Sequence, residues 1–104
     1  MMEIANLIGL LSPIFQKCQV QRALLFGSYA QGQATAKSDI DLLIIMDTEK
    51  RFLDRYDAFT GIYHALKGFA VELLIYTPPE LAAISHRAFI THILKTGKVI
   101  YEHG

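Results

Sequence analysis

Hydrophobic residues near the amino terminus recur every three or four positions, which is the spacing of one face of a helix. They are Ile4, Leu7, Ile8, Leu11, Ile14 and Phe15. The pattern predicts an amphipathic helix over roughly residues 2–17 that packs on a core. Pro13 falls inside this range, so we expect the helix to bend or restart there.

Three short apolar runs have the character of strands. Residues 22–26 form a run that Gly27 stops, which is typical of a buried strand. Residues 40–46 are apolar except for Asp41, as in a strand covered on both faces. Residues 70–76 return to strand character, and residues 98–101 are expected to add a last strand or a short tail that packs on the core.

The clearest helical periodicity lies between the second and third of these runs. It consists of Phe52, Tyr56, Phe59, Ile62, Tyr63 and Leu66. Asp47 and Thr48 precede this set and are typical helix-starting residues, and Gly68 follows it. The sequence therefore predicts one helix that ends at Gly68 and packs its aromatic face on the core.

A helix start follows the third apolar run. Thr77 can cap the helix, Pro78 is tolerated in a first turn, and Glu80 can reach back to the cap amide. This helix is expected to reach about residue 85, and another is expected over residues 88–96. Because helices alternate with strands, the fold is expected to be α/β or α+β, with a small mixed sheet flanked by helices.

Composition narrows the kind of molecule. The 104 residues suffice for one core, so we expect one domain over residues 1–104. Ten basic residues balance ten acidic ones, which argues against strong non-specific binding of nucleic acid and favours a small charged ligand. Cys18 is the only cysteine, which excludes an internal disulfide and a cysteine-rich zinc site and is typical of a reducing compartment.

The first eleven residues are mostly apolar, as they are in signal peptides and membrane spans. Glu3 and Asn6 interrupt this stretch, no basic region precedes it, and Pro13 follows closely. These features do not match a signal peptide or a membrane span. We therefore expect a soluble, cytoplasmic protein.

The candidate chemistry lies around a Gly-Ser turn and two acids. Gly27 and Ser28 follow the first strand, and a short helix expected over residues 29–33 would aim its first amides at a phosphate. Asp39 and Asp41 stand at the head of the second strand, where alternate residues share a face. Two neighbouring carboxylates are costly without a cation, so the pair is either a solvated strand end or a Mg²⁺ site.

Glu72 is the only acid in the third apolar run, and its flanks favour burial. It either pairs with a basic residue at a sheet edge or joins Asp39 and Asp41, if the two strands are adjacent. Other chemistries fit less well. Ser28 lacks the surroundings of a hydrolase nucleophile, Lys37 is not in a P-loop, and the four histidines have no metal spacing.

The order Gly27-Ser28, Asp39-Ile40-Asp41 and then Glu72 resembles the minimal nucleotidyltransferases of the polymerase-beta-like superfamily. The resemblance runs from about residue 23 to 101 and implies the mixed sheet of that fold. It implies that Gly27, Ser28 and Ser38 hold a nucleoside triphosphate. Asp39, Asp41 and Glu72 are implied as the catalytic acids and as the ligands of two Mg²⁺ ions.

The resemblance also implies an activity and a partner. The expected reaction moves a nucleoside monophosphate, AMP from ATP first of all, to a hydroxyl of a protein. The expected partner is a HEPN-type ribonuclease toxin or a similar small helical protein, in a toxin–antitoxin pair; direct binding of nucleic acid is not expected, and a homo-oligomer is left open.

Two other readings remain open. Many relatives carry Asp in place of Glu72 and Arg in place of Gln31, so this chain differs in one ligand arm and lacks one phosphate-pairing charge. A weak or inactive module that neutralises its partner by contact is therefore the alternative. A sensor that binds nucleotide without transfer is the third reading.

Overall fold

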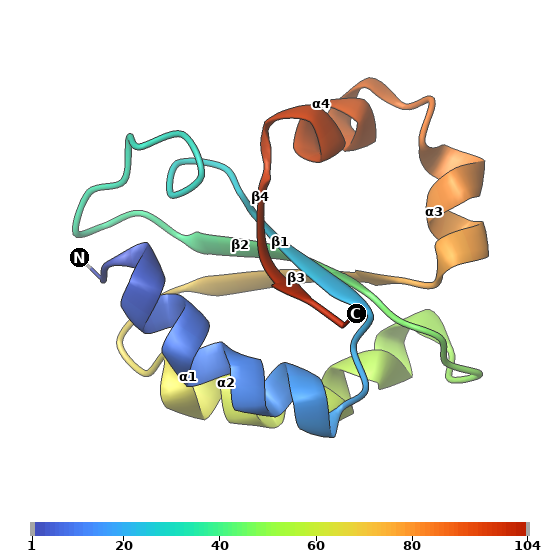
Figure 1. Ribbon diagram of the computed structural model, residues 1–104, viewed down its shortest axis with the longest axis horizontal. Coiled ribbons are helices and arrows are strands. Elements are labelled where there is room, and N and C mark those ends of the chain that lie inside the picture. Colours follow the sequence, from blue (N-terminus) through green and yellow to red (C-terminus); the bar gives the residue numbers. More distant parts are fainter. Residues whose placement is uncertain (1, 104) are drawn as a thin grey trace.

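The computed structural model describes residues 2–103, in which a four-stranded sheet has the order β3-β2-β1-β4 (Figure 1). The strands are β1 (Arg22–Phe26), β2 (Ile40–Ile45), β3 (Val71–Tyr76) and β4 (Lys98–Glu102). β1 runs antiparallel to both β2 and β4, whereas β2 and β3 are parallel. The expected mixed sheet is confirmed, the residues at 98–102 form a strand rather than a tail, and the fold class is α+β.

Helices cover both faces of this sheet. α1 (Ile4–Lys17) and α2 (Thr60–Ala65) lie on one face, and α3 (Pro78–Ile84) and α4 (Ala88–Thr96) lie on the other (Figure 1). Each face has its own hydrophobic cluster, and β2 contributes Leu42 and Ile44 to one and Leu43 and Ile45 to the other. This explains why every residue of β2 after Asp41 is apolar.

The helix predicted from Asp47 to Gly68 is only partly correct. Residues 46–51 form a loop, in which the Thr48 hydroxyl accepts a hydrogen bond from the amide of Lys50 at 3.1 Å instead of capping a helix. A 3₁₀ helix, η1 (Phe52–Phe59), then leads into α2. This segment is anchored by Arg55, whose buried side chain donates hydrogen bonds to Ile75 and Glu80, outside η1.

Two further local expectations differ from the structure. The helix expected over residues 29–33 is absent. Residues 27–32 form hydrogen-bonded turns, in which the amides of Ala30 and Gln31 both bond to the carbonyl of Gly27, at 3.1 and 3.2 Å, and Gly32, with a φ of +70°, ends the turn before a helix can continue. α1 continues through Pro13 without restarting. The capping box at Thr77 and Glu80 is confirmed, and it starts α3 as expected.

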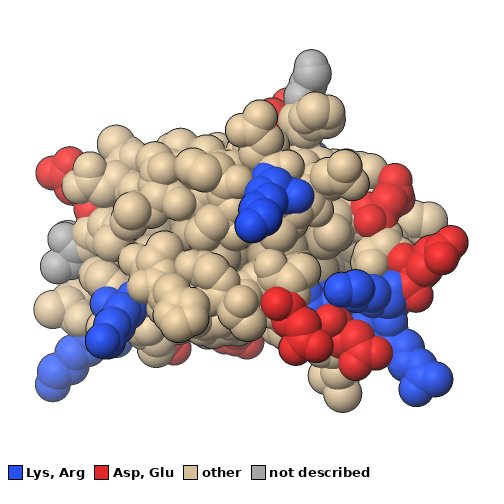
Figure 2. Space-filling model, turned by 90° about the horizontal axis from the view of Figure 1, so that it is seen from below, with Lys and Arg blue, Asp and Glu red and all other residues tan. Residues whose placement is uncertain are grey.

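The surface over α1 and α2 carries few charges. Figure 2 views the molecule from that side and shows a largely uncharged face, with a mixed group of acidic and basic side chains at one end and a few separate charges elsewhere. Lys17 is the one lysine, arginine, aspartate or glutamate within α1, and α2 has none. Within residues 2–103, no helix combines the length and the apolar character that crossing a bilayer requires.

Candidate active site

Asp41 and Glu72 are neighbours across the parallel pair of strands. In the register of β2 and β3, Asp41 is the partner of Glu72, and Phe26 of β1 is the antiparallel partner of Asp41. Paired residues point to the same face of a sheet, so these three side chains lie side by side. We call the two carboxylates of Asp41 and Glu72 the acidic row. The inference that the strand of Glu72 lies beside the strand of the two aspartates is therefore confirmed.

The row lies on the face that α3 and α4 cover, near the edge of the sheet. Asp41 is half-buried, whereas Asp39 and Glu72 are exposed. The expected burial of Glu72 is wrong, because β3 is an edge strand. The apolar cluster on this face consists of Leu24, Phe26, Leu43, Ile45, Ile90 and Ile93, none of which comes from β3. Leu74 and Tyr76 of β3 pack against this cluster only partly buried, and Val71 and Leu73, which flank Glu72, pack on the opposite face.

The electrostatics of Asp41 reflect this crowding. Burial raises the pKa of Asp41 most, followed by the charges of Glu72 and Asp39 and by a side-chain hydrogen bond with Glu72; together they raise it from 3.8 to about 6. Each of these causes disfavours the negatively charged form of Asp41 beside two other carboxylates. The carboxyl group of Asp41 therefore lies where a cation would be strongly favoured.

Gly27 leaves room for the Asp41 carboxylate. A Cβ atom on Gly27 would collide with Oδ2 of Asp41, and the φ of Gly27 is +72°. Glycine adopts this left-handed conformation without the steric cost that other residues bear. The Gly-Ser turn is therefore in direct contact with the acidic row, and no other residue fits at position 27 without displacing Asp41.

The two serines differ in what their polar groups contact. Ser28 is exposed, and its amide makes no hydrogen bond to any group within residues 2–103. The Ser38 hydroxyl accepts a hydrogen bond from the amide of Thr35 at 2.8 Å and thereby closes the loop before β2. Ser28 is free to contact a ligand, whereas Ser38 is held in a loop turn.

A divalent cation can be tested against these residues. The donors are carboxylate oxygens, which suit Mg²⁺, and within residues 2–103 the ion pairs are Arg22–Glu102 and Arg55–Glu80, so no basic side chain neutralises the row. The described residues nevertheless contain no group of three His, Cys, Asp or Glu side chains close enough to hold a metal ion. The charge and donor type fit Mg²⁺: Asp41 and Glu72 lie together, and Asp39 is close enough for its charge to raise the pKa of Asp41.

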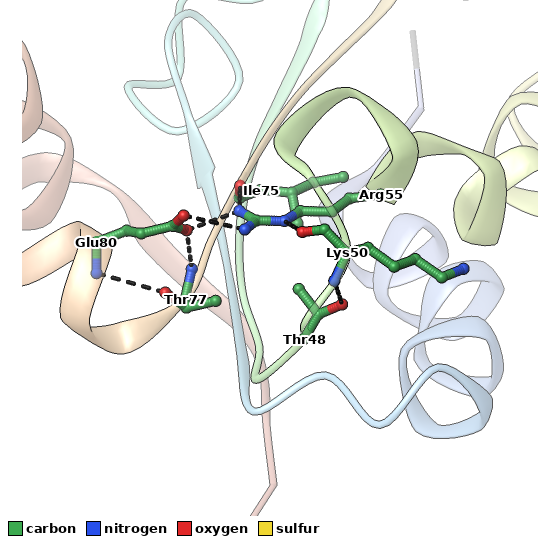
Figure 3. Close-up of polar contacts among 6 residues, drawn as sticks. All are labelled: Thr48, Lys50, Arg55, Ile75, Thr77 and Glu80. Atoms are coloured by element: carbon green, nitrogen blue, oxygen red, sulfur yellow. Dashed lines mark hydrogen bonds and ion pairs between the residues drawn. The ribbon is translucent and has the colours of Figure 1, made fainter.

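Arg55, a residue that no sequence pattern marks as functional, forms a buried polar network (Figure 3). Its guanidinium donates to both carboxylate oxygens of Glu80, at 2.6 and 3.0 Å, and to the carbonyl of Ile75 at 3.0 Å. Hydrogen bonds from Arg55 and Thr77 lower the pKa of Glu80 to about 2. The sequence does contain a signal for the burial of Arg55, because it lies on the same helical face as the hydrophobic residues Phe52 and Phe59.

A second polar contact joins the Gly-Ser loop to α4. The side-chain amide nitrogen of Gln31 lies 3.4 Å from Nε2 of His92. Neither residue was assigned to the site from the sequence, because His92 has no metal-ligand spacing. The contact depends on a separation of 61 residues, which no local pattern reveals.

Comparison with known proteins supports the same family. Residues 10–104 match the family described as "Polymerase beta, Nucleotidyltransferase". Two proteins of Methanocaldococcus jannaschii are similar along most of the chain. One is named "Putative protein adenylyltransferase MJ1305" and is 32% identical, over 97% of this chain and 76% of the relative. The other is named "Putative protein adenylyltransferase MJ0604" and is 30% identical, over 80% of each protein.

Solved structures show the same fold. A chain of a toxin–antitoxin structure with AMP-PNP superposes with a TM-score of 0.63, at 23% identity, over 98% of this chain and 75% of that one. A nucleotidyltransferase structure from Sulfolobus solfataricus has a TM-score of 0.61, at 18% identity, over 97% and 85% of the two chains. Together with the family match, these findings establish that the chain belongs to the polymerase beta nucleotidyltransferase family, as one of its minimal nucleotidyltransferases.

Proposed function

We propose that the protein transfers AMP from ATP to a hydroxyl group of a protein partner, with release of pyrophosphate. The observation that carries this proposal is the row of Asp41 and Glu72 in register, with Gly27 packed against the Asp41 carboxylate. The row supplies adjacent acids that suit metal ions, and the turn supplies a free amide at Ser28 that suits a phosphate.

The chain's own residues have distinct parts in this reaction. Gly27 and Ser28 hold the phosphates of the nucleotide through the turn, and Ser38 supports the loop that delivers the acids. Asp39, Asp41 and Glu72 would hold two Mg²⁺ ions, which supply charge neutralisation at the acceptor oxygen and at the leaving phosphates. The acceptor oxygen forms a bond to the α-phosphorus, the bond to pyrophosphate breaks, and Glu72 takes the acceptor proton.

We further propose that the chain is a single nucleotidyltransferase domain and the antitoxin of a toxin–antitoxin pair, with a HEPN-type ribonuclease as acceptor. Toxin–antitoxin structures among those that share its fold support the pairing. The largely uncharged face over α1 and α2, where Leu10 and Tyr63 are each 44% exposed, is consistent with a protein rather than a nucleic acid as partner (Figure 2).

The test is transfer to a candidate partner. The protein is incubated with ATP, Mg²⁺ and a candidate HEPN-type partner, and the intact mass of each chain is measured. We expect the partner to gain the mass of one or more AMP groups. Asp39→Asn and Asp41→Asn should abolish the gain, and Asp57→Asn, which removes an exposed acid of η1, should not. Equal transfer by the Asp41 variant would contradict the proposed chemistry.

A contact-only module is a second candidate, and one observation favours it. The described residues bring Asp41 and Glu72 together but form no group of three metal-binding side chains. This candidate predicts that the complex with the partner forms without ATP and that Asp41→Asn still neutralises the toxin. Neutralisation that is lost with Asp41 while the complex persists would exclude it.

A further inference from the structure

Phe89 is an aromatic residue that the fold leaves uncovered. It lies in the first turn of α4, and 58% of its surface is exposed. Its ring meets the ring of Phe26 edge-on, with centroids 6.0 Å apart and planes at 83°. Because only an edge contact links the two rings, most of the Phe89 side chain remains open to a ligand.

The position of Phe26 brings Phe89 close to the acidic row. Phe26 pairs with Asp41 across the antiparallel ladder, so the two side chains are neighbours on one face. Phe26 also directly precedes Gly27, the start of the proposed phosphate-binding turn. Phe89 is therefore one contact away from a residue that touches both halves of the proposed site.

A second contact holds α4 to the same loop. His92 lies three residues after Phe89, on the same side of the helix, and contacts Gln31 of the Gly-Ser loop. Two independent links, Phe26–Phe89 and Gln31–His92, thus hold this face of α4 against the end of β1 and the turn that follows it. The exposed ring of Phe89 is therefore held in a defined position by the packing of α4.

We propose that the Phe89 ring is the stacking platform for the nucleobase of the bound nucleoside triphosphate. This inference rests on the proposed function, which puts the phosphates at Gly27 and Ser28. Every nucleobase has a π face, so stacking accepts any base. Phe89 should therefore favour a nucleotide over a bare polyphosphate, without selecting ATP over GTP.

The absence of tryptophan from the sequence allows a direct optical test. Phe89→Trp introduces a single indole at the proposed platform. Leu94→Trp is the matched control, because Leu94 is on α4 and 37% exposed but lines a surface hollow with Arg22 and Ile45, at the other end of the strands. Phe89→Leu removes the aromatic face and keeps an apolar side chain against Phe26.

The experiment titrates each variant with AMP-PNP and, separately, with inorganic tripolyphosphate, both with Mg²⁺, by calorimetry and by fluorescence. We expect AMP-PNP to quench the indole of Phe89→Trp and not that of Leu94→Trp, and tripolyphosphate to quench neither. Phe89→Leu should bind AMP-PNP about 5-fold to 150-fold more weakly, with tripolyphosphate binding unchanged.

The outcomes separate this inference from the proposed function. If the native protein binds AMP-PNP and Phe89→Leu binds it equally well, Phe89 is not the platform and the transferase proposal stands. The inference also fails if tripolyphosphate binds the native protein as tightly as AMP-PNP. If the native protein binds neither compound, both proposals fail. Thermal unfolding of each variant checks that α4 remains folded.

Discussion

Gly27 and Asp41 illustrate how single residues shape this site. The glycine has a positive φ and its α-carbon lies against the Asp41 carboxylate, so one residue both turns the chain and opens space for an acid. Gly32 has almost the same φ, +70°, but no atom lies within 4 Å of the position its Cβ would take. Comparing Gly27 with Gly32 therefore separates two contributions to stability: the cost of a left-handed backbone conformation and the cost of a side-chain collision.

We expect Gly32→Ala to lower the free energy of unfolding by about 1–2 kcal/mol, which is the cost of a left-handed conformation. Gly27→Ala should cost about 1–3 kcal/mol more, because the added methyl overlaps Asp41. Denaturant unfolding measures both values. In an Asp41→Ala background the two glycine variants should become equally costly, and a persisting difference would show that the collision lies elsewhere.

Asp41 should destabilise the metal-free protein above its pKa. The raised pKa, about 6 against an ordinary 3.8, means that the folded state holds the proton more tightly than the unfolded state. Stability then falls as the pH rises from about 4 to about 6. We expect Asp41→Asn to melt at a higher temperature than the native protein at pH 7.5 in chelator, with the difference vanishing below about pH 4.

Asp57→Asn removes one negative charge at an exposed position of η1 and is the control for this measurement. A gain in melting temperature that is the same at pH 4 and pH 7.5 for Asp41→Asn would contradict the assigned cause.

At the scale of elements, the Arg55–Glu80 pair joins η1, β3 and α3 (Figure 3). The Arg55 side chain is only 6% exposed, and its guanidinium also satisfies the carbonyls of Lys50 and Ile75. Removing one member of such a pair leaves buried polar groups without partners. The network anchors residues 52–59 against β3 and α3.

We expect Arg55→Met to lower the free energy of unfolding by about 3 kcal/mol or more. The native protein should also lose stability as the pH falls from about 4.5 to about 2, because Glu80 has a lowered pKa and gives up its charge only in that range. In Glu80→Gln, this loss of stability at acid pH should be much smaller. Glu102→Gln, in the exposed pair with Arg22, should leave it unchanged.

At the scale of the whole molecule, ligand binding and stability should be linked through the acidic row. We expect Mg²⁺ with AMP-PNP to raise the melting temperature of the native protein, by an amount equivalent to about 2.7 kcal/mol at 100 times the dissociation constant. Asp41→Asn should lose most of this gain. An equal gain in both proteins would mean that the nucleotide binds away from the row.

Much of the architecture follows from local patterns. The strands at 22–26 and 40–45, the capping box at Thr77, and α1 and α4 could be predicted because their signals are contained in short windows of sequence. Neighbouring residues along the chain fix hydrophobic periodicity and caps, whatever the rest of the molecule does. The order of Gly27, Ser28 and the Asp-x-Asp pair is likewise contained in a short window of sequence.

Other features required the tertiary structure. The pairing of Asp41 with Glu72, the exposure of Glu72 at a sheet edge, the burial of Arg55 and the contact of Gln31 with His92 all join residues far apart in the chain. A sequence window cannot contain them, because strand neighbours and edges are decided by how the whole chain packs. The sequence by itself determined the elements and the acids available, and the packed sheet decided which of those acids meet.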